Sequence, residues 1–169
     1  MDDEEKKGEE IAKEALKEGG VQALVYYDIH GSSPDTLKNI LIGFVGKLIA
    51  EPGVLHAYGK IEKPQKDEVE NEFYSSAEVK MAFRDFNSLA ILCVKYMPIG
   101  IEILKPHEIS LGMGEAQNML LNIASITNEY AEELLKRSVS EEEKIAYGKK
   151  ILKREELGRK LLEKKDNGE

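Results

Sequence analysis

The chain of 169 residues has the length of one compact domain with additional helices, and it is long enough to bury a core without disulfides. Its formal net charge of −8 and its aromatic content of 7% argue against a protein that coats the phosphate backbone of nucleic acids. The single cysteine cannot form an internal disulfide, and no apolar run reaches the roughly 18 residues of a membrane span. We therefore expect a cytoplasmic protein without a membrane partner, and its Lys and Glu content fits a thermophilic source.

Charge divides the chain into three segments. Residues 1–20 predict an acidic N-terminal helix, because eight acidic and four basic residues precede the Gly19-Gly20 stop. Residues 21–138 carry the regular hydrophobic pattern of a folded core followed by a long helix. Residues 139–169 predict a charged helical tail that opens with a capping box at Ser140 and Glu143.

Strand-like and helix-like patterns alternate within the middle segment. VQALVYYDI (21–29) is rich in β-branched and aromatic residues and predicts a buried strand. In the next helix Ser33 suits the N-cap, Pro34 suits the first helical position, and Pro52-Gly53 marks the end. The remaining predicted elements are strands at 54–64, 73–85 and 99–104, a charged hairpin loop PQKDEVENE, a helix capped by Asn87 or Ser88, and a long helix at 114–138 with an apolar stripe.

This order, β-α-β-β-α-β, predicts an α+β fold of the ferredoxin-like type. Such a fold has a four-stranded antiparallel sheet with two helices on one face, to which this chain adds a short N-terminal helix and C-terminal helices. Over about residues 21–104 the order resembles small ferredoxin-like regulatory modules, of which amino-acid-binding ACT domains are one example. The resemblance is one of topology without a diagnostic motif, so it implies no particular function.

The segment YYDIHGSSPD (26–35) holds the candidate ligand-binding residues. On an extended strand Asp28, His30 and Ser32 alternate to one side, which brings a carboxylate, an imidazole and a hydroxyl close together. With Ser33 and Asp35 at the start of the following helix, this loop could bind a small anionic ligand. A small enzyme centred on Asp28, His30 and Ser32 is the alternative, although no nucleophile elbow is present.

The pattern offers no metal or cofactor motif. The three histidines lack the spacing of a helical His pair, the chain has no cysteine pair, and no phosphate loop or dinucleotide fingerprint occurs. We therefore expect no cofactor and no metal, and no catalytic residue is assigned.

The sheet's other face is the candidate interface. Tyr26, Tyr58 and Tyr74 are predicted there among polar residues, a mixture that suits an interface better than a core. The long helix 114–138 or another subunit would cover it. The first hypothesis is therefore a non-enzymatic binding or assembly module that self-associates.

The basic tail leaves one further alternative open. From 144 to 165 nine basic residues stand against three acidic ones, so the tail could be an RNA-binding arm. The acidic N-terminal helix could equally pair with it, within one chain or across a dimer. Because aromatic residues for base stacking are scarce, we favour pairing or plain solvation over a nucleic-acid partner.

Overall fold

The computed structural model describes residues 3–68 and 71–138, together with Ile145, Lys149, Leu152, Lys153 and Glu156. The chain consists of two compact units, Met1–Ala124 and Ser125–Glu169, and the sheet lies in the first. The elements in chain order are α1 (Asp3–Lys17), β1 (Val21–Gly31), α2 (Pro34–Ile49), β2 (Val54–Ile61), β3 (Gln65–Asp67), β4 (Glu72–Phe83), α3 (Phe86–Tyr96), β5 (Gly100–Lys105) and α4 (Met113–Ser138).

The fold is α+β, with a five-stranded antiparallel sheet and four helices in the described part of the chain. Its strand order is β2-β4-β1-β5, and β3 pairs with β4 beyond the end of β2. The sheet thus has one strand more than the four-stranded arrangement that the sequence predicts. The prediction of a loop at 64–72 was wrong for β3, because the 12-residue β4 extends past β2 and offers a partner there. The Tyr74 hydroxyl donates to the Gln65 side-chain oxygen at 2.9 Å across this added pair.

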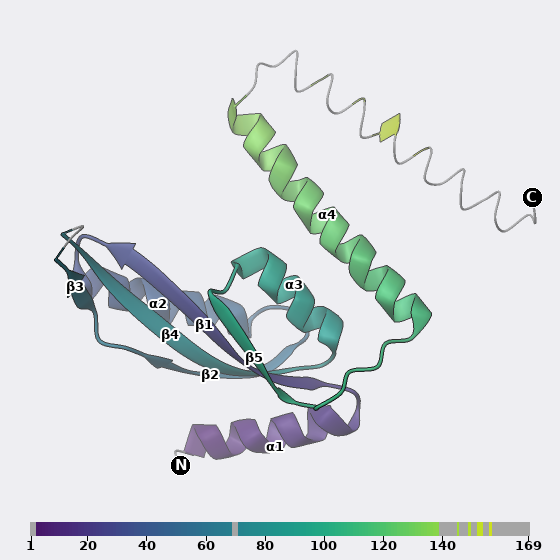
Figure 1. Cartoon of the computed structure of the whole chain (residues 1–169), viewed down its shortest axis with the longest axis horizontal. Helices are drawn as coiled ribbons and strands as arrows, with labels where there is room; N and C mark the ends of the chain where they lie inside the picture. Colours follow the sequence, from purple (N-terminus) through teal and green to yellow (C-terminus); the bar gives the residue numbers. More distant parts are fainter. Residues whose placement is uncertain are drawn as a thin grey trace, which may run out of the picture. The chain divides into compact units, whose positions relative to one another are not determined.

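Helices cover the two faces of the sheet unequally. Helices α2 and α3 lie on one face and α1 lies on the other (Figure 1). The hydrophobic core forms between the sheet and the α2/α3 layer, because one side chain in two along β1 and β4 points there. Its buried residues are Val21, Ala23, Val25, Tyr27, Leu41, Leu48, Ala77, Val79, Met81, Phe83, Leu89 and Leu92.

Two helix starts differ from the predicted capping. Helix α3 is capped by Asp85, whose carboxylate accepts hydrogen bonds from the Ser88 backbone N–H at 2.7 Å and from the Ser88 hydroxyl at 2.6 Å. The prediction of Asn87 or Ser88 as the cap was wrong, since both residues are inside the helix. Ser33 is at the N-cap of α2 as predicted, but its side chain makes no capping hydrogen bond.

Helix α4 starts at Met113, close to the predicted position, and contributes little to the core. Between Met113 and Leu134 none of its residues is buried, and Leu120 and Leu121 are exposed. The predicted tail helix at 139–169 falls outside the described residues except for the five named above. Among the helices that the structure describes, none has both the length and the apolar character that crossing a bilayer requires.

Substitutions at two adjacent residues of α2, one buried and one exposed, test which side of this helix packs into the core. Leu41 is 0% exposed and Ile42 is 52% exposed. We expect Leu41→Ala to lower the free energy of unfolding by about 2–5 kcal/mol, because it leaves a cavity in the core. Ile42→Ala is the matched control and should change it by about 0.5 kcal/mol or less. Urea denaturation followed by circular dichroism measures both, and equal losses would show that α2 packs differently.

Candidate functional site

The candidate site is the face of the sheet that points away from α2 and α3, called here the second face. Side chains alternate along a strand, and Ala23, Val25 and Tyr27 lie in the core, so the even-numbered residues of β1 lie on the second face. These residues are Gln22, Leu24, Tyr26, Asp28 and His30.

The strand register adds side chains from β2, β4 and β5 to the second face. Residues directly opposite each other in an antiparallel pair share a face. Glu78 is paired with both Tyr26 and Lys60, and Lys80 is paired with both Leu24 and Tyr58. Further along, Tyr74 is paired with His30, and Glu102 of β5 is paired with Leu24. The three tyrosines that the sequence predicted as an interface therefore share the second face with charges of both signs.

Helix α1 covers one end of the second face. Its residues are mostly good helix formers, and the buried ones are the small residues Gly8, Ala12 and Ala15. Small residues let the helix backbone approach the strands closely. The sequence had suggested α4 or another subunit as the cover, whereas the structure places α1 there (Figure 1).

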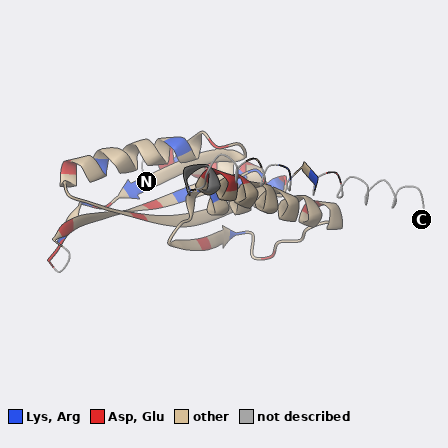
Figure 2. Ribbon diagram, turned by 90° about the horizontal axis from the view of Figure 1, so that it is seen from above, with Lys and Arg blue, Asp and Glu red and all other residues tan. Residues whose placement is uncertain are grey.

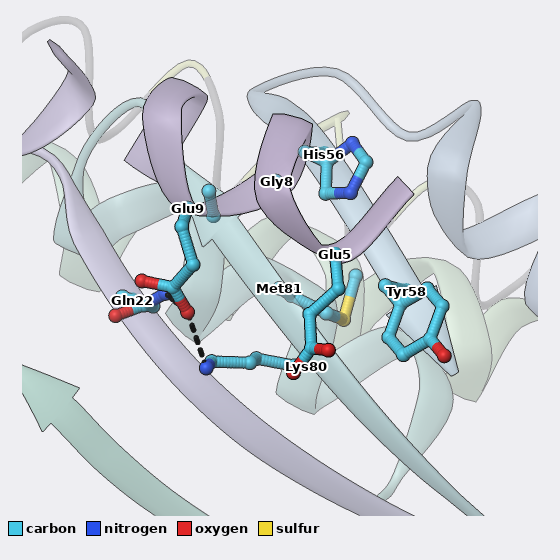
Figure 3. Close-up of a pocket in the computed structure, with 9 residues that line it drawn as sticks. Glu5, Gly8, Glu9, Gln22, His56, Tyr58, Lys80 and Met81 are labelled. Carbon is cyan, nitrogen blue, oxygen red and sulfur yellow. Dashed lines mark hydrogen bonds and ion pairs between the residues drawn. The ribbon is translucent and has the colours of Figure 1, made fainter. Parts of the chain in front are cut away.

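A charged contact joins α1 to the sheet. The Lys80 ammonium of β4 forms an ion pair with the Glu9 carboxylate of α1, and the Gln22 side-chain amide lies 3.4 Å from the same carboxylate oxygen (Figure 3). The hydrogen bond from Lys80 holds the pKa of Glu9 below its ordinary value, against the opposing effect of burial. Both charged side chains remain about one-third exposed, so we expect the pair to contribute modestly to stability.

Next to this ion pair, α1 lies directly over His56. A Cβ atom added at Gly8 would lie 2.5 Å from the His56 Nε2, which shows how closely the helix passes over the imidazole (Figure 3). The Nε2 atom is buried and has no hydrogen-bond partner among the described residues. The cavity beside it measures about 10 Å³, which is room for about one water molecule and for no larger ligand.

Beyond α1 the second face is open. A shallow depression of about 220 Å³ lies there. Its lining combines apolar and charged side chains, which are Glu5, Leu24, Tyr58, Lys60, Glu78, Lys80 and Leu104. The pKa of Tyr26 is raised above its ordinary value, first by burial and then by the negative charges of Glu78 and Glu102. Tyr58 and Tyr74 are partly exposed on the same side.

The predicted ligand-binding residues are divided between two places. His30 Nε2 lies 3.2 Å from Asp28 Oδ2 on the open part of the second face, and the His30 and Tyr74 ring centroids are 6.2 Å apart. Ser32 and Ser33 follow β1 instead, at the approach to α2, and Asp35 lies in the first turn of that helix.

This division bears on the enzymatic alternative. A nucleophilic triad needs a hydrogen bond from the serine to the histidine as well as one from the histidine to the carboxylate. Asp28 and His30 are in contact, but the structure gives no hydrogen bond between Ser32 and His30 in the described segments. Within those segments no three His, Cys, Asp or Glu side chains converge in a way that could hold a metal ion.

The contacts of Glu9, Lys80 and His56 were not predicted. Each residue type is common on a solvated surface. The sequence around Glu9 does not indicate that α1 packs on the strands of Lys80 and His56. One signal was present: Gly8, Ala12 and Ala15 recur at helical spacing, which is typical of a helix face that packs closely.

Residues 22–161 match the model of the MJ0538 family. The chain belongs to the MJ0538 family. The matched segment begins at the second residue of β1 and includes all later strands, whereas α1 lies before it. Neither a curated protein nor a solved structure matches the chain. The side chains of the second face therefore lie in the matched segment, and the helix that covers one end of it lies outside.

The Glu9–Lys80 pair predicts a pH-dependent stability. Because the pKa of Glu9 is lowered in the folded protein, its contribution is present above the ordinary value of 4.5 and is lost as pH falls through the lowered value. We expect Glu9→Gln to lower the free energy of unfolding by about 0.2–1 kcal/mol at neutral pH and to leave it unchanged at a pH below the lowered pKa of Glu9. Urea denaturation at both pH values measures this. The exposed Glu10 gives the control Glu10→Gln, and an equal loss at both pH values would contradict the assignment.

Because α1 passes closely over His56, the effect of Gly8→Ala on the free energy of unfolding should change sign when His56 is replaced. We expect Gly8→Ala to destabilise the protein, because the new methyl group meets the imidazole. In a His56→Ala background the same change should stabilise it by up to about 1 kcal/mol, because alanine is the better helix former. Urea denaturation of the four proteins of this cycle measures the coupling. The same effect of Gly8→Ala in both backgrounds would mean that α1 does not contact His56.

Proposed function

We propose that this protein is a non-enzymatic interaction module that self-associates through the open part of the second face. The observation that carries the proposal is that Tyr26, Tyr58 and Tyr74 share this face and that α1 covers only one end of it. Tyrosine combines a large apolar ring with a polar hydroxyl, and it is enriched where protein surfaces meet.

The charges on the same face support a second copy of the chain as the partner. Lys60 is opposite Glu78 in the strand register, and Lys80 and Glu102 are opposite Leu24 from its two sides. A two-fold axis places the same patch on both subunits, so each acidic position can face a basic position of the other copy. Basic and acidic residues are also interspersed along the ribbon (Figure 2), which is a poorer match to a phosphate backbone than to a mixed surface.

The loop at 28–36 is the weaker candidate site. The carboxylate of Asp28 stands 3.2 Å from the imidazole of His30, and negative charge at this point opposes a small anionic ligand. The other residues expected to contribute, Ser32, Ser33 and Asp35, lie apart from this pair, at the approach to α2 and in its first turn. This separation and the charge of Asp28 support the tyrosines of the second face over the anion site. The RNA-binding alternative depends on tail residues that fall largely outside the described segments.

Two finer proposals accompany the function. We propose that the fold is of the ferredoxin-like type, with α1, β3 and α4 as additions. The succession β1-α2-β2 and β4-α3-β5 supports this, because in each unit the helix connects two strands that flank a third. We also propose a cytoplasmic location, which the single half-buried cysteine supports.

Paired tyrosine variants test the proposed surface. We expect Tyr26→Ala with Tyr58→Ala to raise the dissociation constant of the self-associated protein at least about tenfold, because tyrosines at the centre of an interface contribute strongly to binding. Sedimentation velocity over a concentration series measures this constant, and circular dichroism checks the fold. Tyr130→Ala, at a partly exposed tyrosine of α4, is the matched control.

Two results would contradict the proposal. One is a wild-type protein that stays monomeric at every concentration. The other is an unchanged dissociation constant in a folded Tyr26→Ala, Tyr58→Ala variant.

A further inference from the structure

The strand β5 forms one edge of the sheet. It pairs with β1 on one side, and no further strand of the described residues pairs with its other side. An edge strand presents backbone N–H and C=O groups to which another strand can add. The edge of β5 is therefore a potential template for strand addition.

Two isoleucines of β5 continue the core face of the sheet to this edge, but they remain half exposed there. Ile101 is paired with Val25 and Ile103 with Ala23, and both β1 residues are 0% exposed. Ile101 and Ile103 share their face of the sheet, yet they are 46% and 42% exposed. Two isoleucines thus lie at the border of the core with one side uncovered, and Ile99 just before the strand is also exposed.

The opposite edge, at β2, is organised differently. Both edge strands carry a register irregularity and a lysine, at Leu55 and Lys60 in β2 and at Leu104 and Lys105 in β5. Only β2 is also covered, because helix α1 and helix α2 both pack against it. A covering helix is one of the means by which proteins protect a sheet edge. In the described part of the chain, β1 is the only element with an extensive contact to β5.

We propose that the free edge of β5 pairs in antiparallel orientation with β5 of a second copy of this chain. The two five-stranded sheets then join across a two-fold axis that passes beside Ile103, because directly opposite residues of an antiparallel pair share a face of the sheet. Pairing covers the backbone edge of both copies and brings the exposed isoleucines of one copy against those of the other.

Charge favours this direction. Glu102 is the third of the six residues of β5, and Lys105 is the last. A two-fold axis beside Ile103 keeps the Glu102 side chains of the two copies from lying directly opposite each other, whereas an in-register parallel pair places like charges together. The pairing of β5 with β1 is regular from Gly100 to Ile103, and the register shifts beyond Ile103. A two-fold contact also pairs the β5 edge of one copy with the β5 edge of the other, so neither β5 edge remains free for a third chain.

This inference does not depend on the proposed function. The open part of the second face and the edge of β5 are different surfaces, and either can bind a second copy without the other. If both are used, each chain has two kinds of self-contact and the assembly exceeds a dimer.

Single-cysteine cross-linking tests the β5 pairing. The chain has one cysteine, so Cys93→Ser gives a cysteine-free background. We introduce Ile103→Cys, at the proposed axis, Glu102→Cys, one residue away, and Ser32→Cys, an exposed control at the approach to α2. Across the proposed axis the two copies of position 103 lie directly opposite each other, within the roughly 4.4–6.8 Å between Cα atoms that a disulfide spans. After mild oxidation of the full-length protein, non-reducing electrophoresis measures the covalent dimer.

We expect at least one β5 variant to form a covalent dimer in most molecules and Ser32→Cys to form it in few. The same cross-linking in the Tyr26→Ala, Tyr58→Ala background separates the two proposals, because β5 cross-links should persist even if the second face is not an interface. Cross-linking at β5 no greater than at Ser32 would overturn the inference, whether the protein is oligomeric or monomeric by sedimentation.

A second variant checks the apolar contribution. Ile101→Lys with Ile103→Lys adds charge at two half-exposed positions, so we expect a fold retained by circular dichroism. In the Tyr26→Ala, Tyr58→Ala background, where the second face no longer contributes, we expect a dissociation constant raised at least about tenfold. A folded variant with unchanged self-association in that background would overturn the inference.

Discussion

The antiparallel pairing of β1 with β4 is the constraint on which the rest of the structure depends. Its register is continuous from Val21 opposite Phe83 to Gly31 opposite Phe73. Because side chains alternate along both strands, a shift by one residue would move every apolar side chain of one strand to the other face. The observed register places Val25 with Val79 in the core and Tyr26 with Glu78 on the second face. One pairing therefore decides both where the core forms and what the second face presents.

The two faces of the sheet are held by different interactions. On the core side, leucines of α2 and α3 pack into a continuous apolar layer with the strands. On the second face, α1 approaches through Gly8, Ala12 and Ala15 and adds the Glu9–Lys80 ion pair. Small side chains bury little area, and a partly exposed ion pair adds little, so we infer that α1 is held less firmly than α2 or α3. The segment that matches the MJ0538 family begins after α1, within the strand that the helix covers.

Much of the secondary structure follows from the sequence, and the errors have identifiable causes. The strands at β1, β2, β4 and β5 and all four helices follow from periodicity, which local side-chain chemistry determines. Strand β3 was missed because Gln65–Asp67 has no strand-like composition, and its conformation comes from the partner that β4 provides. The α3 cap was missed because Asp85, Asn87 and Ser88 are all good caps, and only the backbone conformation selects Asp85.

At the candidate site, too, the local sequence predicted some features and only the tertiary structure decided others. The sequence by itself determined that Tyr26 and Tyr74 alternate away from the apolar residues of their strands, because the period of two is a local property of an extended chain. It also determined that Asp28 and His30 lie on one side, and their contact follows from that spacing. Only the tertiary structure decided that α1 lies on Lys80 and His56 and that Ile101 and Ile103 reach an uncovered edge. Those outcomes depend on which strands are neighbours and on which elements end the sheet, and no local pattern of side chains carries that information.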